Sequence, residues 1–208
     1  MEVKQGILLL IVAIYVQDGD NHGMMLEPPG RSSRWRTNNS APINYDDNSL
    51  FCGGYAVQWE VNGGKCGICG DAYNDPRPRK NELGGLYGQG DVVGKYNSGS
   101  IIAVTIRLSA NHKGYFTFSL CDLKQFAEEE ECFHPIRFSD GSDRAYVQPG
   151  LGNVTYSLSL PNGLRTEHGI LRWQYRAGNN WGTEPNGTQC VGCGSQETYR
   201  NCADISIA

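Results

Sequence analysis

The sequence predicts an all-β domain, a β-sandwich with long loops held by disulfides. Alternation of apolar and polar residues begins after residue 100, as expected for half-buried antiparallel strands. Residues 22–100 are instead rich in glycine, asparagine and proline, which are typical of loops. Eight cysteines follow an apolar N-terminal segment, and this combination indicates an exported protein with a disulfide framework.

The N-terminal segment has the three parts of a secretory signal peptide. Lys4 precedes an apolar run at 6–16, and a short polar stretch follows at 17–21. The run is shorter than the about 20 residues that a membrane-spanning helix needs. Gly19 fits the small residue that signal peptidase prefers at position −3, whereas Asn21 does not fit position −1. We expect a signal peptide over residues 1–21 and one mature domain over residues 22–208.

The charge of the mature domain excludes some partners. Glu2, Lys4, Asp18 and Asp20 leave with the signal peptide, which changes the formal net charge from −4 to −2. A nearly neutral surface gives no long-range attraction to nucleic acid or anionic lipid. We expect a secreted, extracellular monomer with neither nucleic acid nor a membrane as partner.

The strands are expected in the second half of the chain. In the first of them Val104, Ile106 and Leu108 share one face and polar residues take the other. The segments are "IIAVTIRL" (101–108), "YFTFSLC" (115–121), "VTYSLSL" (154–160), "LRWQYR" (171–176) and, as a last strand, "CADISI" (202–207). Four consecutive acidic residues, Glu128–Glu131, favour an exposed loop over a helical turn. Antiparallel strands of this kind pack as two layers of a sandwich.

Two CxxC motifs raise the question of zinc. They are "CGIC" (Cys66 and Cys69) and "CVGC" (Cys190 and Cys193). About 120 residues separate them, far more than in a zinc ribbon, and an oxidising compartment favours disulfides.

The cysteines therefore predict up to four disulfides, whose pairing the sequence leaves open. The eight are Cys52, Cys66, Cys69, Cys121, Cys132, Cys190, Cys193 and Cys202. Three N-glycosylation sequons, at Asn38, Asn153 and Asn186, fit the same compartment.

No hydrolase motif is present. The chain has no GxSxG elbow, HExxH helix or Cys–His nucleophile pattern. The glycines of "GLYGQG" (85–90) lack the flanking parallel strand and helix of a phosphate-binding loop.

His22 differs from the other histidines by its position after the expected cleavage site. Once exposed as the first residue, it owns both an imidazole and an α-amine, and an amine of pKa about 7.7–8.0 can lose its proton to a metal near neutral pH. One further imidazole gives three nitrogens in a T shape, which suits copper better than tetrahedral zinc. His112, in a turn between two strands, and His168, at the start of another, are both candidates for it. His134, beside a cysteine and a proline, is expected to be structural.

Five stretches spread over the mature chain carry a resemblance to a known family. They are "HGMMLEPPGRSSRW", "FCGGYAVQW…GGKCGICGD", "SANHKGYFTFSLC", "LRWQYRAGNNWG" and "VGCGSQETYRNCADISI". Together they resemble the lytic polysaccharide monooxygenases of auxiliary activity family 15, which have a chitin-binding type-4-like domain. The resemblance implies an immunoglobulin-like or fibronectin III-like β-sandwich with a surface copper site. It implies that His22 binds copper through its amine and Nδ1, and that His112, rather than His168, binds through Nε2.

Three further residues take roles from the resemblance. Tyr199 falls on the axial aromatic position of the copper site, although an aromatic there also suits a core. Ala110 corresponds to the small residue that crowds the open axial side in bacterial chitin-active relatives, although it also suits a plain turn. Glu197 corresponds to a polar residue that holds an oxygen species near copper, although it also suits a solvated carboxylate.

The function implied is that of a secreted copper-dependent monooxygenase that cleaves crystalline chitin, or cellulose, by oxidation at C1. Such an enzyme needs an external electron donor and hydrogen peroxide or dioxygen. Two other hypotheses remain, a non-catalytic secreted chitin-binding protein of the same fold and a disulfide-rich adhesion domain. Exposed aromatics such as Trp181 and Tyr45 would stack on sugar rings in an enzyme or a binding protein alike, so copper binding is what distinguishes these two.

Overall fold

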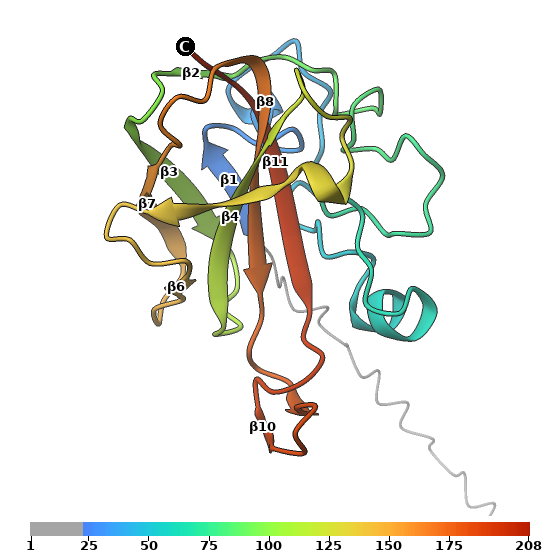
Figure 1. The fold of residues 1–208 in the computed structure, drawn as a ribbon. Helices are drawn as coiled ribbons and strands as arrows, with labels where there is room; N and C mark the ends of the chain where they lie inside the picture. Colours follow the sequence, from blue (N-terminus) through green and yellow to red (C-terminus); the bar gives the residue numbers. More distant parts are fainter. Residues whose placement is uncertain (1–22) are drawn as a thin grey trace, which may run out of the picture.

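The computed structural model describes residues 23–208, and strands dominate this part of the chain (Figure 1). The strands are β1 (Gly23–Glu27), β2 (Gly94–Tyr96), β3 (Ile101–Leu108), β4 (Tyr115–Asp122), β5 (His134–Phe138), β6 (Ala145–Tyr146), β7 (Gly152–Ser159), β8 (Thr166–Arg176), β9 (Trp181–Thr183), β10 (Gln189–Val191) and β11 (Thr198–Ile207). Three short helical turns accompany them: η1 (Arg34–Arg36), η2 (Val57–Val61) and η3 (Glu130–Cys132). Within residues 23–208 no helix has the length and apolarity needed to cross a membrane.

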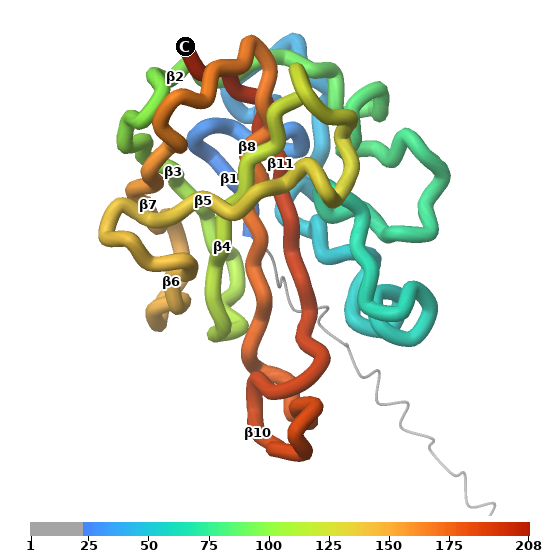
Figure 2. The backbone as a smooth tube through the Cα atoms, viewed as in Figure 1, coloured from blue at the N-terminus to red at the C-terminus, as the bar shows by residue number. Residues whose placement is uncertain are grey.

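The strands form one hydrogen-bonded path that folds over into two layers. Its order is β1-β3-β7-β5-β4-β8-β11-β2, with β6 beside β4. β5 links the layers, because it pairs with β7 at one end and with β4 at the other. β9 and β10 form a separate hairpin that extends from the end of the molecule where β8 stops and β11 begins (Figure 2). The predicted all-β sandwich is confirmed.

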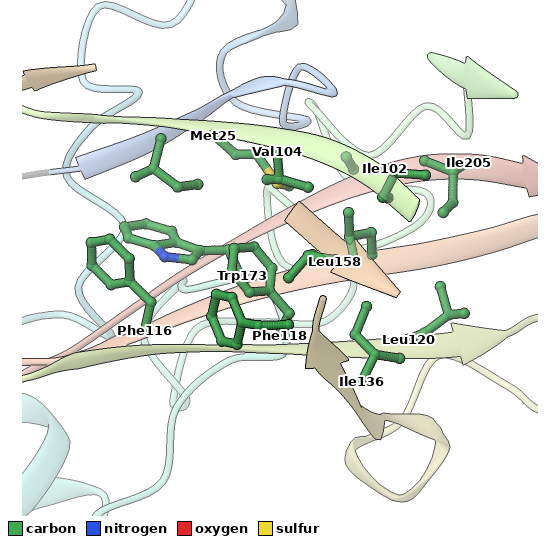
Figure 3. Packing of buried hydrophobic residues seen from close by; sticks show 14 of the residues in the cluster. Met25, Ile102, Val104, Phe116, Phe118, Leu120, Ile136, Leu158, Trp173 and Ile205 are labelled. Atoms are coloured by element: carbon green, nitrogen blue, oxygen red, sulfur yellow. The ribbon is translucent and has the colours of Figure 1, made fainter. Parts of the chain in front are cut away.

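The hydrophobic core lies between the two layers. Met25 and Val104 from one layer face Phe116 and Trp173 from the other (Figure 3), and all four are almost completely buried. Their strands alternate between buried and more exposed positions, as half-buried strands do. The bounds predicted for β3 are those observed, and β4 extends one residue beyond its prediction.

The acidic segment follows the prediction of an exposed loop only in part, because Glu129, Glu130 and Glu131 are exposed but the rest differs. Residues 130–132 form the turn η3, and Glu128 is buried. Its carboxylate accepts a hydrogen bond from the Arg31 guanidinium at 2.5 Å and another from the backbone N–H of Leu83 at 2.6 Å. A buried charge is tolerated when it is paired in this way. The prediction considered only the repulsion between neighbouring carboxylates, and the partners of Glu128 lie far from it in the sequence.

All eight cysteines form disulfides, as predicted, and none is free. The pairs are Cys52–Cys66, Cys69–Cys202, Cys121–Cys132 and Cys190–Cys193. The second CxxC motif therefore closes on itself, whereas the two cysteines of the first bind different partners. Neither motif keeps thiols for zinc.

Candidate metal centre

The turn between β3 and β4 places His112 at the end of the sandwich from which the β9–β10 hairpin extends. Lys113 and Gly114 both have positive φ angles, 57° and 74°, so the chain reverses sharply after the histidine. A Cβ on Gly114 would lie 2.0 Å from the carbonyl oxygen of Arg176. Only glycine allows this close contact between the turn and the end of β8.

The backbone of His112 is held by two residues at the end of β8. Its N–H donates to the hydroxyl of Tyr175 at 2.8 Å, and its carbonyl accepts from the N–H of Gly178 at 2.8 Å. The side-chain amide of Asn179 lies 2.5 Å from Nδ1 of the ring. Three contacts thus fix both the main chain and the ring of a residue that is only 7% exposed.

Nε2 of His112 is the unusual atom of this site. It is buried and has no hydrogen-bond partner among the described residues. A buried ring nitrogen without a partner is uncommon and costly, and neutral imidazole is a frequent metal ligand. The nitrogen is therefore a candidate metal donor once its proton lies on Nδ1, and it is the atom that the resemblance assigns to copper.

Tyr199, on β11, lies beside the His112 ring. The centroids of the His112 and Tyr199 rings are 6.3 Å apart, with an angle of 27° between the ring planes. Tyr175 also stacks on Tyr199, with the ring centroids 5.5 Å apart. Phe51 stacks on Tyr199 as well, at 6.2 Å. Tyr199 is thus both a core aromatic, 1% exposed, and a residue of the site.

Burial, with a smaller contribution from Glu197, keeps the Tyr199 phenol neutral. The Tyr199 hydroxyl donates to Oε2 of Glu197 at 3.3 Å. Burial raises the pKa of Tyr199 well above its ordinary value, and the nearby Glu197 charge and hydrogen bond raise it further. In the absence of a metal, Tyr199 is therefore a neutral phenol near neutral pH. Glu197 itself is partly exposed, so its carboxylate lies at the border between the core and solvent.

Ala110 and Gly23 complete the described surroundings of the site. Ala110 is half-buried in the turn, two residues before His112. Gly23 pairs with Leu108, four residues before His112, and a Cβ on Gly23 would lie 2.8 Å from the ring of Trp173. His22, the other predicted copper ligand, lies outside the described residues.

The two remaining histidines lie away from His112. His168 is near the start of β8, seven residues before Tyr175, which at 3.3 Å per residue is roughly 23 Å. Its Nε2 lies 2.8 Å from Oδ1 of the buried Asp204. His134 is exposed on β5, and its ring packs edge-on against Phe126. Within residues 23–208 no group of three or more His, Cys, Asp or Glu is arranged to hold a metal.

Sequence reasoning did not identify two residues of the site. Tyr175 was expected only as an inward-facing core residue, and Asn179 was not distinguished at all. The strand pattern of "LRWQYR" gives the direction of Tyr175, but the partner of its hydroxyl depends on a turn 63 residues away in the sequence. Asn179 lies in "AGNNWG", where adjacent asparagines predict only a loop.

Comparison with known proteins identifies the family of the chain. A family model described as "lytic polysaccharide mono-oxygenase, cellulose-degrading" matches residues 22–205. Among solved structures, the chain is similar to a lytic polysaccharide monooxygenase AA15 from Thermobia domestica in the Cu(I) state, with 46% sequence identity and a TM-score of 0.86. The match covers 90% of this chain and 99% of that chain. A search of curated proteins gave no match. The chain belongs to the lytic polysaccharide monooxygenases, and it is therefore a copper-dependent oxidoreductase acting on polysaccharide.

Proposed function

We propose that the protein is exported, that cleavage before His22 exposes its α-amine, and that His22 and His112 together hold one copper ion. His22 would contribute the amine and Nδ1, and His112 would contribute Nε2. The observation that carries the proposal is the buried, unpartnered Nε2 of His112. A second observation supports it: Gly23 pairs with Leu108, at the strand end that leads into the His112 turn, and consecutive Cα atoms are only about 3.8 Å apart.

When bound, copper would supply the one-electron chemistry by which hydrogen peroxide or dioxygen, with electrons from an external donor, oxidises a C–H bond. The protein residues supply position and environment. Tyr199, buried beside the His112 ring, would pack against the copper site and exclude water from that side of it. Glu197, partly exposed next to that phenol, would hold the oxygen co-substrate by hydrogen bonding. Ala110, in the same turn as His112, would restrict how closely the substrate approaches the copper site, which favours attack at C1.

We propose crystalline chitin as the substrate. Trp181 is 66% exposed on the hairpin beside the site and pairs across it with Val191, which is 51% exposed. An exposed indole on a disulfide-closed hairpin offers a flat apolar face for a pyranose ring. Cellulose is the second candidate, because the matching family model is described as cellulose-degrading.

Export is supported by the four disulfides and by the positions of the three sequons. Asn38, Asn153 and Asn186 are all exposed, as glycosylation requires. We propose that residues 1–21 are removed and that the monomeric domain acts outside the cell.

The test is product analysis with matched histidine variants. Copper-loaded protein beginning at His22, given ascorbate and hydrogen peroxide, is incubated with crystalline chitin and separately with cellulose, and released oligosaccharides are analysed by mass spectrometry. We expect C1-oxidised chitin oligosaccharides from the wild type and from His134→Ala, and none from His112→Ala. Oxidised products from His112→Ala at the wild-type level would contradict the assignment of the ligand. Chitin binding without oxidised products from the wild type would contradict the proposed reaction, and products from cellulose alone would contradict the proposed substrate.

A further inference from the structure

We propose that Asn179 is the positioning residue that selects the copper-binding tautomer of His112, an inference that rests on the proposed copper site. A neutral imidazole carries one proton, on either Nδ1 or Nε2. Nε2 can donate its lone pair to a metal only if the proton is on Nδ1. Selection of the tautomer therefore depends on what Nδ1 contacts, and Nδ1 contacts the side-chain amide of Asn179 at 2.5 Å.

The amide of Asn179 can favour either tautomer, depending on which atom it presents. In the structure Nδ2 faces Nδ1 of His112, an arrangement in which Nδ1 accepts and Nε2 keeps the proton. A half-turn of the amide exchanges its nitrogen and oxygen with little change of shape. Oδ1 then accepts a hydrogen bond from Nδ1–H, and Nε2 is left with a free lone pair. We infer that this second orientation is the one present in the copper enzyme.

The backbone around Asn179 is held firmly enough to keep its side chain against the ring. On one side, the N–H of Gly178 donates to the carbonyl of His112 at 2.8 Å. On the other, the N–H of Asn180 donates to the side chain of Gln196 at 3.0 Å, and the Gln196 amide donates back to the Asn180 carbonyl at 2.9 Å. Gln196 is 1% exposed. Although Asn179 itself is exposed, both of its chain neighbours are fixed to buried groups.

The buried Nε2 explains why the tautomer matters here. With the Asn179 amide oriented as in the structure, the Nε2–H group would be buried without an acceptor among the described residues. An unsatisfied buried donor is unfavourable. The opposite tautomer leaves a lone pair that a metal ion satisfies. Residues that hold the second nitrogen of a metal-binding histidine typically change metal affinity 10–100-fold when they are removed.

Three variants separate this role from a merely structural one. Asn179→Ala removes both donor and acceptor. Asn179→Asp keeps the shape and can only accept when ionised, so it tests whether the acceptor is what matters. Asn180→Ala is the matched control, because the contacts of Asn180 with Gln196 are made by its backbone.

The first measurement is Cu(II) affinity, by competition with a chelator, for protein beginning at His22. We expect Asn179→Ala to weaken binding about 10–100-fold and to change the paramagnetic-resonance spectrum, whereas Asn179→Asp and Asn180→Ala stay near the wild type. Wild-type affinity in Asn179→Ala would overturn the proposal. Equal loss in Asn179→Asp and Asn179→Ala would also overturn it, since the donor would then be the group that matters.

The second measurement needs no metal and no variant. Proton–nitrogen correlation NMR of the metal-free wild type reports which His112 nitrogen carries the proton. We expect Nδ1–H, and a population dominated by Nε2–H would overturn the proposal even if the Asn179 variants did not fold. If the wild type bound no copper, the copper site itself would fail, whereas the NMR result would still decide the tautomer.

Discussion

At the scale of single residues, the proposed copper site depends on how firmly His112 is placed. Its main-chain N–H donates a hydrogen bond to the Tyr175 hydroxyl, and its carbonyl accepts one from the N–H of Gly178. Burial raises the pKa of Tyr175 far above its ordinary value, so the phenol stays protonated and its oxygen stays available to the His112 N–H over the working pH range. The position of the proposed metal-binding ring is thus set by a neutral hydroxyl on a neighbouring strand.

Substitution of Tyr175 by phenylalanine tests this placement. Tyr175→Phe keeps the ring stacking but leaves the His112 N–H without its acceptor, which should lower the free energy of unfolding by about 1–3 kcal/mol. Urea denaturation of the metal-free protein measures it. Tyr156→Phe is the comparison, because Tyr156 is a half-buried tyrosine that packs edge-on against Phe116 away from His112. Equal effects of the two substitutions would show that the hydrogen bond contributes nothing.

At the scale of elements, a buried ion cluster joins the loop after β1 to β11. Arg31 makes two parallel hydrogen bonds to Asp204, each of 2.7 Å, and a third to Glu128. Burial alone would raise the pKa of Asp204, but the hydrogen bonds from Arg31 and His168 outweigh it and hold that pKa below its ordinary value. The carboxylate is therefore stabilised in the folded state in its charged form.

The free energy of unfolding of the Asp204→Asn variant should differ from that of the wild type by an amount that depends on pH. A depressed folded pKa contributes stability that is present above the unfolded pKa of 3.8 and is lost as the pH falls through the folded pKa. At pH 7 we expect Asp204→Asn to be less stable than the wild type by about 3–5 kcal/mol, because Arg31 loses a buried partner. The gap should narrow as the pH falls below about 4. Denaturation series at several pH values measure it, and a gap that is constant down to pH 2 would contradict the linkage.

At the scale of the whole molecule, disulfides of very different span hold the loops to the sandwich. Cys69–Cys202 joins the loop-rich first half of the chain to β11 across 133 residues, whereas Cys190–Cys193 spans three. If a disulfide acts mainly by restricting the unfolded chain, its contribution rises with the logarithm of the loop it closes. The long-span bridge should then matter far more to global stability than the hairpin bridge.

Paired alanine variants compare the two bridges. The loop-closure relation gives about 5 kcal/mol for the Cys69–Cys202 bridge and about 1.6 kcal/mol for the Cys190–Cys193 bridge. Calorimetry on the Cys69→Ala/Cys202→Ala and Cys190→Ala/Cys193→Ala proteins should show the larger fall in melting temperature for the first. A larger fall for the second pair would mean that the hairpin bridge stabilises the native state directly.

The parts of the fold that local pattern governs could be predicted from the sequence. β3 was predicted with its observed bounds because Val104 and Ile106 alternate with polar neighbours. β11 begins at Thr198, four residues earlier than expected, because its first residues pair with the end of β8. This pairing leaves no pattern in the local sequence. In "LRWQYR" (171–176), the alternation puts Arg172 on the polar face, opposite Trp173 and Tyr175. It is 6% exposed because Glu130, 42 residues away, pairs with it.

The site divides in the same way. The sequence predicts the turn around His112, which the structure confirms, and a terminal His22, which stays a prediction because it lies outside the described residues. The resemblance chose His112 over His168. The structure places His168 on Asp204, remote from the His112 turn. The contact of Asn179 with the ring could not be predicted, because it arises where the loop after β8 meets the β3–β4 turn, 67 residues away in the sequence.

The most direct test of the copper site is Cu(II) paramagnetic resonance on two proteins that differ by one residue. One begins at His22, and the other carries a single alanine before it, which converts the α-amine into an amide. We predict that the first binds one Cu(II) per chain with coupling to three nitrogens, and that the second loses this spectrum while keeping the same fold by circular dichroism. Identical spectra and affinities from the two proteins would contradict the account.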